Sequence, residues 1–206
     1  MRGMVLSAQA GLASGSDAGP DAARRSTERD FAAIDHFSAA IDIEPHDSDA
    51  LFYRGLVWAR LGRTDAAEAD FQKAVELTSG RKGIVRARAN YCLAILVQSR
   101  TAGQRAPLAY MAQAVASLPP EYSHTEEAGE MHLHRATIQE RLGYLGAAKT
   151  SYQDAAKAVH SLDSRRSRNV LAAAEPALRR LNQKTESPDA TTAATASAIA
   201  AAIAAA

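Results

Sequence analysis

The stretch AAEADFQKAVEL, residues 66–77, has an earlier counterpart in AIDHFSAAIDIEP, residues 33–45. Aligned without a gap, the two agree in side-chain size and type at four positions 34 residues apart: Ala33 with Ala67, Phe37 with Phe71, Ala40 with Ala74, and Ile43 with Leu77. A fixed period of this length is typical of helical solenoids, in which each repeat packs on its neighbour. The pattern therefore predicts an all-α repeat protein.

The segment between these stretches predicts another helix with defined ends. Pro45 ends the earlier helix, because proline has no amide hydrogen to continue it. Asp47 or Ser48 is suited to cap the next helix, which we expect over residues 50–61 and which Gly62 ends.

The turn after Gly62 leads into the helix that carries the repeated stretch. Thr64 or Asp65 is suited to cap this helix, and its buried stripe is expected at Ala67, Phe71 and Ala74. The predicted unit is thus a helix, a tight turn and a second helix.

Residues 49–77, DALFYRGLVWARLGRTDAAEADFQKAVEL, closely resemble the tetratricopeptide repeat. The positions that match its pattern are Gly55, Trp58, Leu61-Gly62, Ala67, Phe71 and Ala74. Arg54 departs from the pattern, because leucine is commoner at its place. The resemblance implies a short right-handed solenoid of antiparallel helix pairs, with about three to four repeats.

Other parts of the chain follow the pattern less tightly. Residues 130–159 match it at Ala136, Leu142-Gly143, Ala148, Tyr152 and Ala155. Ser123 with Glu126 is predicted to form a capping box before them. A divergent repeat is expected between the two clear ones, with helices over residues 85–98 and 107–120.

The two ends of the stack are expected to be irregular. The first repeat keeps mainly its second helix, near residues 26–43, and a final helix over residues 164–184 caps the stack. Pro176 is expected to kink or restart that final helix near Glu175. The predicted domains are a disordered leader over 1–24, a repeat domain over 25–183 and an alanine-rich, low-complexity tail over 184–206.

Composition excludes several classes of partner. The chain has 206 residues, with 24 basic and 23 acidic side chains and a formal net charge of +1. This balance gives no support for nucleic-acid binding. The apolar tail is too short for a membrane span. The single cysteine, Cys92, excludes a disulfide within the chain, and we expect a cytoplasmic protein.

We expect no catalytic activity, cofactor or metal. His132 and His134 are two residues apart, so on a helix they point to different faces, and the sequence has neither an HExxH motif nor paired cysteines. Cys92 is expected to be a buried, inert thiol. Phosphate-loop, dinucleotide and nucleophile-elbow motifs are also missing from the sequence.

In the family, the first helix of each repeat lines a concave groove that holds a partner segment. Carried over by resemblance, this groove presents Phe52, Leu56, Arg60, Arg86, Leu93, Leu96, Leu133, Thr137 and Arg141. An apolar groove with arginines at its edge suits an apolar or amphipathic protein segment. The alternative is that these leucines are core, or are covered by the final helix.

One subgroup of the family grips the acidic C-terminal tails of heat-shock chaperones with lysine, asparagine and arginine. Those clamp places hold here Phe52, Leu56, Asn90, Glu130 and His134. Only Asn90 fits, and Glu130 would repel a carboxylate, so we do not expect such a tail as the partner.

The sequence therefore predicts a non-catalytic scaffold or adaptor. A structural subunit of a larger complex, or a protein that self-associates through the same apolar face, is the alternative. The basic side chains of the final helix, from Arg165 to Lys184, are expected to be a solvated outer face, with docking of an acidic partner as the alternative.

Overall fold

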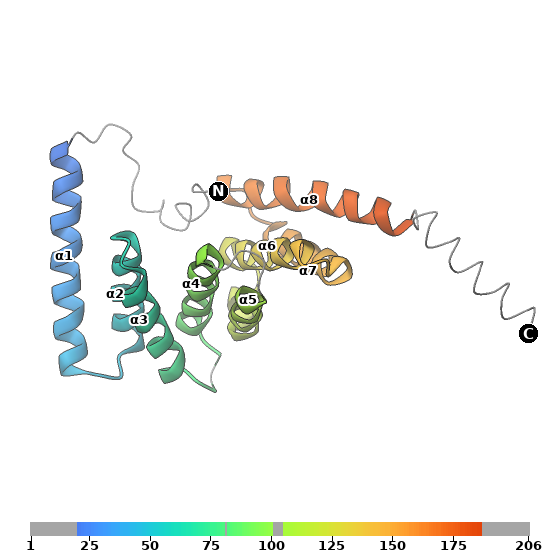
Figure 1. Ribbon diagram of the computed structural model, residues 1–206. Coiled ribbons are helices and arrows are strands. Elements are labelled where there is room, and N and C mark those ends of the chain that lie inside the picture. The colour runs from blue at the N-terminus through green and yellow to red at the C-terminus, as the bar shows by residue number, and fades with distance from the viewer. Residues whose placement is uncertain (1–19, 81, 101–104, 187–206) are drawn as a thin grey trace, which may run out of the picture. The chain divides into compact units, whose positions relative to one another are not determined.

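The computed structural model describes residues 20–80, 82–100 and 105–186, which form eight α-helices, one 3-10 turn and no strand (Figure 1). The helices are α1 (Pro20–Ile43), α2 (Ser48–Arg60), α3 (Thr64–Leu77), α4 (Ile84–Arg100), α5 (Ala106–Ser117), α6 (Glu126–Arg141), α7 (Leu145–Val159) and α8 (Arg165–Glu186), and the 3-10 turn η1 covers Pro120–Tyr122. The predicted all-α class and the expected order of helices are confirmed. Most of the predicted leader and tail, residues 1–19 and 187–206, lies outside the described residues.

The helices form two compact units, one made by the described residues up to Pro120 and the other by those from Glu121. In the first unit each helix packs on the next, from α1 to α5, and α2 also touches α4. In the second unit α7 packs between α6 and α8, and α8 also contacts α6. Consecutive helix pairs of this kind are the arrangement of an α-solenoid.

The turn between α2 and α3 forms for the reasons that the sequence suggests. The Asp47 side chain caps α2 by accepting hydrogen bonds from the amides of Asp49 and Ala50, at 3.0 and 2.9 Å. Gly62 follows α2 with φ 73°, a conformation that glycine adopts at no steric cost. Gly143 makes the matching turn between α6 and α7 with φ 81°.

Two predicted caps are wrong. The N-cap of α3 is Arg63, which makes no side-chain capping bond, and not Thr64 or Asp65, which already lie inside the helix. The cap of α6 is Thr125, whose hydroxyl accepts from the amide of Ala128 at 3.2 Å, and not Ser123. Thr125 has the extended backbone that an N-cap needs, with φ −123° and ψ 159°.

The predicted restart of the final helix at Pro176 is also wrong, because α8 runs without interruption from Arg165 to Glu186. Proline removes the hydrogen bond to the carbonyl four residues earlier, which belongs to Ala172. Both Pro176 and Ala172 are exposed, so water can satisfy that carbonyl.

The core of the first unit lies between α2, α3 and α4. Phe71, Ala67 and Ala74 are fully buried, as predicted for the stripe of α3. Gly55 of α2 lies directly against Phe71, and a Cβ atom at Gly55 would stand 2.8 Å from the ring atom Cε1. This glycine therefore permits the close approach of α2 and α3.

Candidate partner-binding surface

In the first unit, α2 and α4 bring four of the predicted groove residues to one core cluster. Phe52 and Leu93 are buried within it, at 4% and 1% exposure. Leu56 and Leu96 are partly buried and pack against the same cluster. The leucines at the surface thus rest on a floor that includes Phe52 and Leu93.

The two arginines predicted at the edge of this surface are held by neighbouring helices. Arg60 of α2 donates to both carboxylate oxygens of Asp30 on α1, with Nε at 2.8 Å from Oδ2. The Asp30 side chain is only 8% exposed, whereas that of Arg60 is 39% exposed. Arg86 of α4 donates from Nη1 to the carbonyl of Val75 at 2.8 Å, near the end of α3.

The three groove residues predicted in the second unit lie on α6. Leu133 is buried, at 7% exposure. Thr137 is half-buried, and its hydroxyl donates to the carbonyl of His134 at 2.8 Å. Arg141 is exposed in the last turn of the helix.

The structure shows an interhelix contact that the sequence analysis missed. Arg54 donates to both carboxylate oxygens of Asp70, from Nε and Nη2 at 2.8 and 2.7 Å, and to Ser38 Oγ at 3.1 Å. It thereby links α2 to α3 and to α1. The hydrogen bond to Asp70 raises the pKa of the Arg54 guanidinium.

The same place in the second clear repeat is also an arginine. Arg135 of α6 donates to Ser151 Oγ at 3.0 Å and to Asp154 at 3.2 Å, both on α7. The Arg54–Asp70 and Arg135–Ser151 pairs are each 16 residues apart. An arginine at one repeat position, with a polar residue 16 positions later, was the signal available in the sequence.

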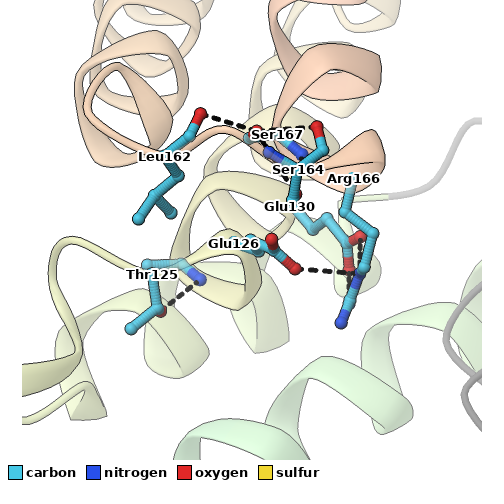
Figure 2. A network of polar contacts seen from close by, with 8 residues as sticks. Thr125, Glu126, Glu130, Leu162, Ser164, Arg166 and Ser167 are labelled. Atoms are coloured by element: carbon cyan, nitrogen blue, oxygen red, sulfur yellow. Dashed lines mark hydrogen bonds and ion pairs between the residues drawn. The ribbon is translucent and has the colours of Figure 1, made fainter.

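The second unit contains a network of polar contacts where α8 begins beside α6 (Figure 2). Arg166 of α8 donates to both carboxylate oxygens of Glu130, at 3.0 and 2.7 Å, and lies 3.7 Å from Glu126. These contacts raise the pKa of Arg166, chiefly through the hydrogen bond to Glu130. The hydroxyl of the fully buried Ser167 donates to the carbonyl of Leu162 at 2.9 Å, which fixes the preceding turn.

A second contact ties α8 to α6 further along. Arg180 donates to Glu140 Oε1 at 2.6 Å, and the Tyr152 hydroxyl of α7 donates to Oε2 of the same carboxylate at 2.9 Å. Burial and this bond raise the pKa of Tyr152. Between the two contacts α8 buries an apolar stripe, which consists of Val170, Ala174, Ala177 and Leu181.

The basic side chains of α8 are thus largely engaged within the unit. Arg166 and Arg180 bind α6, Arg168 lies 2.6 Å from Asp163, and Arg179 lies 4.0 Å from Glu175. Their main partners are acids of this chain, which favours a structural role for these side chains over docking of an acidic partner.

A surface hollow of about 360 Å³ lies beside this network, lined by His124, Thr125, Glu126, Glu127, Leu162 and Arg166. Arg166 pairs with Glu126 here and Thr125 caps α6, so the hollow does not offer a converging set of groups for catalysis.

The histidines do not form a metal centre in the described part of the chain, where no three His, Cys, Asp or Glu side chains converge. His132 Nδ1 lies 3.7 Å from Asp154 Oδ2 and 3.3 Å from Arg135 Nη2. Burial lowers the pKa of His132, and Arg135 lowers it further. Burial also lowers the pKa of His134, against the opposing effect of Glu130.

Among residues 20–80, 82–100 and 105–186, no helix combines the length and the apolarity that crossing a bilayer requires. The thiol of Cys92 is half-buried, so it is less enclosed than the sequence led us to expect.

Comparison with known proteins agrees with this geometry. The sequence model of the tetratricopeptide repeat matches residues 48–80, which contain α2 and α3. No curated protein matches the chain in sequence. A solved structure described as "Crystal structure of MamA" is 14% identical, aligns over 82% of this chain and 96% of its own, and superposes with a TM-score of 0.52. Another, "Crystal structure of MamA protein", is 14% identical over 81% of this chain and 91% of its own, with a TM-score of 0.49.

The helix pairs and their packing define the chain as an α-solenoid. Residues 48–80, which contain the pair α2 and α3, match the tetratricopeptide repeat. Such repeats build extended concave surfaces that act as protein-interaction scaffolds and in general carry no catalytic machinery.

Proposed function

We propose that the chain is a non-catalytic scaffold that binds an apolar or amphipathic protein segment on the groove residues of α2 and α4. The observation that carries this proposal is the position of Leu56 and Leu96, which are both partly buried and pack against the same core cluster. A partner that covers them removes further apolar area from water without reorganising the helices.

The neighbouring arginines suit the same role. Arg60 and Arg86 are already fixed by Asp30 and by the Val75 carbonyl, so little side-chain entropy is lost when a partner meets them. We further propose that Leu133, Thr137 and Arg141 form the corresponding contact surface of α6 in the second unit, with Leu133 as its buried floor.

The chemistry of the partner follows from what the surface holds. Asn90, which alone matched the clamp for chaperone tails, is fully buried, and Glu130 is engaged with Arg166. The proposal therefore excludes a heat-shock chaperone tail and nucleic acid, and it needs no cofactor or metal. A cytoplasmic location fits the single cysteine.

The test is affinity capture with quantitative mass spectrometry, which compares the wild type with the double variant Leu56→Glu/Leu96→Glu. These leucines are preferable to Phe52, because a charge at a 4% exposed position would disturb folding. Ala69→Glu, on the exposed side of α3, is the matched control for added charge. Circular dichroism and a melt verify that each variant is folded.

The expected result is at least one protein that the wild type and the control enrich and the double variant loses. That protein, once purified, should bind with an affinity that falls about a hundredfold in the double variant, as expected when a charge enters an apolar contact. Equal capture by all three chains would contradict the proposal. A mass that rises with concentration in light scattering, and falls back in the double variant, would instead support self-association through the same face.

A further inference from the structure

The first repeat of the stack is incomplete in the described part of the chain, which contains its second helix, α1, but no first helix before it. In the complete repeat, α2 and α4 both pack on α3, and Ala67, Phe71 and Ala74 have zero exposure. Their counterparts 34 residues earlier are only half-buried, and we call them, together with Tyr53 of α2, the half-repeat face: Ala33, Phe37, Ala40 and Tyr53. Within its unit, α1 lies at one end with α2 on one side (Figure 1).

An aromatic pair marks the centre of this face. The rings of Phe37 and Tyr53 stack with centroids 6.0 Å apart and an interplanar angle of 17°. Tyr53 is 43% exposed, and Phe37 is only half-buried. The aromatic pair is therefore partly open to water.

The charge beside the face differs from that of the complete repeat. In α3, Asp70 receives Arg54 of the covering helix. The residue of α1 that corresponds to Asp70 is His36, which is exposed. Arg25, Arg29, Ala33, His36 and Ala40 are spaced to lie on one side of α1. This side carries two exposed arginines, Arg25 and Arg29, and has no acid at the place of Asp70.

We propose that the half-repeat face binds an amphipathic α-helix of another protein, with a small residue over Phe37 and a carboxylate at the place that Arg54 occupies in α2. The packing of α2 on α3 is the template for this interface. Gly55 shows why the residue over the phenylalanine must be small, because a Cβ there already stands 2.8 Å from the Phe71 ring. Arg25 and Arg29, together with the lack of an acid at the place of Asp70, favour an acidic helix over a basic one.

The probes are two fluorescent peptides with the sequence of residues 48–62, one with the native arginine at place 54 and one with Arg54→Glu. Their binding to the full-length protein is measured by fluorescence anisotropy. Short peptides lose conformational entropy when they bind as helices, so the ratio of the two affinities is the informative quantity. We expect the glutamate peptide to bind about tenfold more tightly, because arginine at place 54 would lack its carboxylate partner and would be repelled by Arg25 and Arg29, which attract glutamate.

The charge swap His36→Asp is the decisive variant, because His36 is exposed and its replacement leaves packing intact. His36→Asp places a carboxylate on α1 where α3 has Asp70, so the preference should reverse in favour of the arginine peptide. Phe37→Asp should abolish binding of both peptides. Phe31→Asp is the matched control, since Phe31 is 49% exposed on another side of α1, and should bind as the wild type does.

Several results would overturn the proposal. These are no binding of either peptide by the wild type, unchanged binding by Phe37→Asp, or a preference that His36→Asp leaves unaltered. Dimerisation that Phe37→Asp abolishes would assign the face to a second copy of the chain. Binding that appears only after removal of residues 1–19 would assign it to the chain's own leader.

Discussion

Arg54 of α2 and Asp70 of α3 form a two-point hydrogen bond, at 2.8 and 2.7 Å, where the tetratricopeptide pattern commonly has leucine. The side chains are 22% and 9% exposed, so the pair lies mostly out of water. Two parallel bonds between a guanidinium and a carboxylate fix orientation as well as distance. This pair therefore sets how α2 lies on α3, in addition to the apolar contact of Gly55 with Phe71.

We expect Asp70→Ala to lower the free energy of unfolding by about 2–4 kcal/mol, because it leaves the charge of Arg54 partly buried and unpaired. Arg54→Leu/Asp70→Ala should recover most of that loss, since an apolar pair needs no compensating charge. Urea unfolding of the single and double variants completes a double-mutant cycle. If the losses simply add, the two residues do not act as a pair.

Phe71→Ala should lower the free energy of unfolding by about 3–5 kcal/mol, because the fully buried ring leaves a cavity between α2 and α3. A thermal melt measures the effect. Phe31→Ala on the exposed part of α1 is the matched control and should melt close to the wild type. An unchanged melt of Phe71→Ala would contradict the register in which the repeat is aligned.

Gly55→Ala should cost about 1–3 kcal/mol although alanine favours helix, because its Cβ would meet the Phe71 ring at 2.8 Å. In the Phe71→Ala background the same change should become neutral or stabilising, since the obstructing ring is gone. Urea midpoints of the four chains decide this. If Gly55→Ala stabilised the wild type, α2 and α3 would not be as closely packed at this position as the structure indicates.

The attachment of α8 should depend on its apolar stripe more than on its arginines. Leu181 is 1% exposed, and Leu181→Ala should cost about 2–5 kcal/mol. Arg166→Met should cost about 1 kcal/mol or less, because its side chain is 48% exposed and ion pairs in water contribute little. Hydrogen exchange of the α8 amides, with and without salt, separates the contribution of the apolar stripe from that of the arginines.

The helices could be predicted from the sequence because spacing and turn residues agree along α2 and α3. Helix caps were harder to predict, since several hydroxyls and acids lie near each helix start and only the backbone conformation selects one. Thr125, and not Ser123, is the cap because its backbone is extended, which the amino-acid sequence alone does not reveal. Pro176 was misjudged because the sequence does not reveal that the orphaned carbonyl faces water.

The groove residues could be placed on their helices from the repeat register, but not divided into floor and surface. Phe52 and Leu56 are one turn apart and equally apolar, yet only Phe52 is buried, because exposure depends on how α4 packs against α2. The Arg54–Asp70 contact was missed because a single departure from the repeat pattern was interpreted as a tolerated substitution. The arginine at the matching position of α6, Arg135, makes the same kind of interhelix contact.

The stability of the second unit should fall as the pH drops below about 6.5. That is the ordinary pKa of histidine, and the folded protein lowers the pKa of both His132 and His134, chiefly through burial. Above pH 6.5 both states are neutral there and the full stability is present. Below it the unfolded chain binds protons before the folded one does, so stability falls until the pH passes the folded pKa, below which the loss stays constant.

The charges around His132 explain why protonation is opposed. Arg135 of α6 lies 3.3 Å from its Nδ1 and opposes a positive ring, whereas Asp154 of α7 favours one but stands further away, at 3.7 Å. Urea midpoints at pH 7.5 and pH 5.5 should therefore differ less in His132→Gln/His134→Gln than in the wild type. The exposed His36→Gln is the matched control and should keep the wild-type difference. An equal pH dependence in the double variant would place the acid sensitivity of the fold elsewhere.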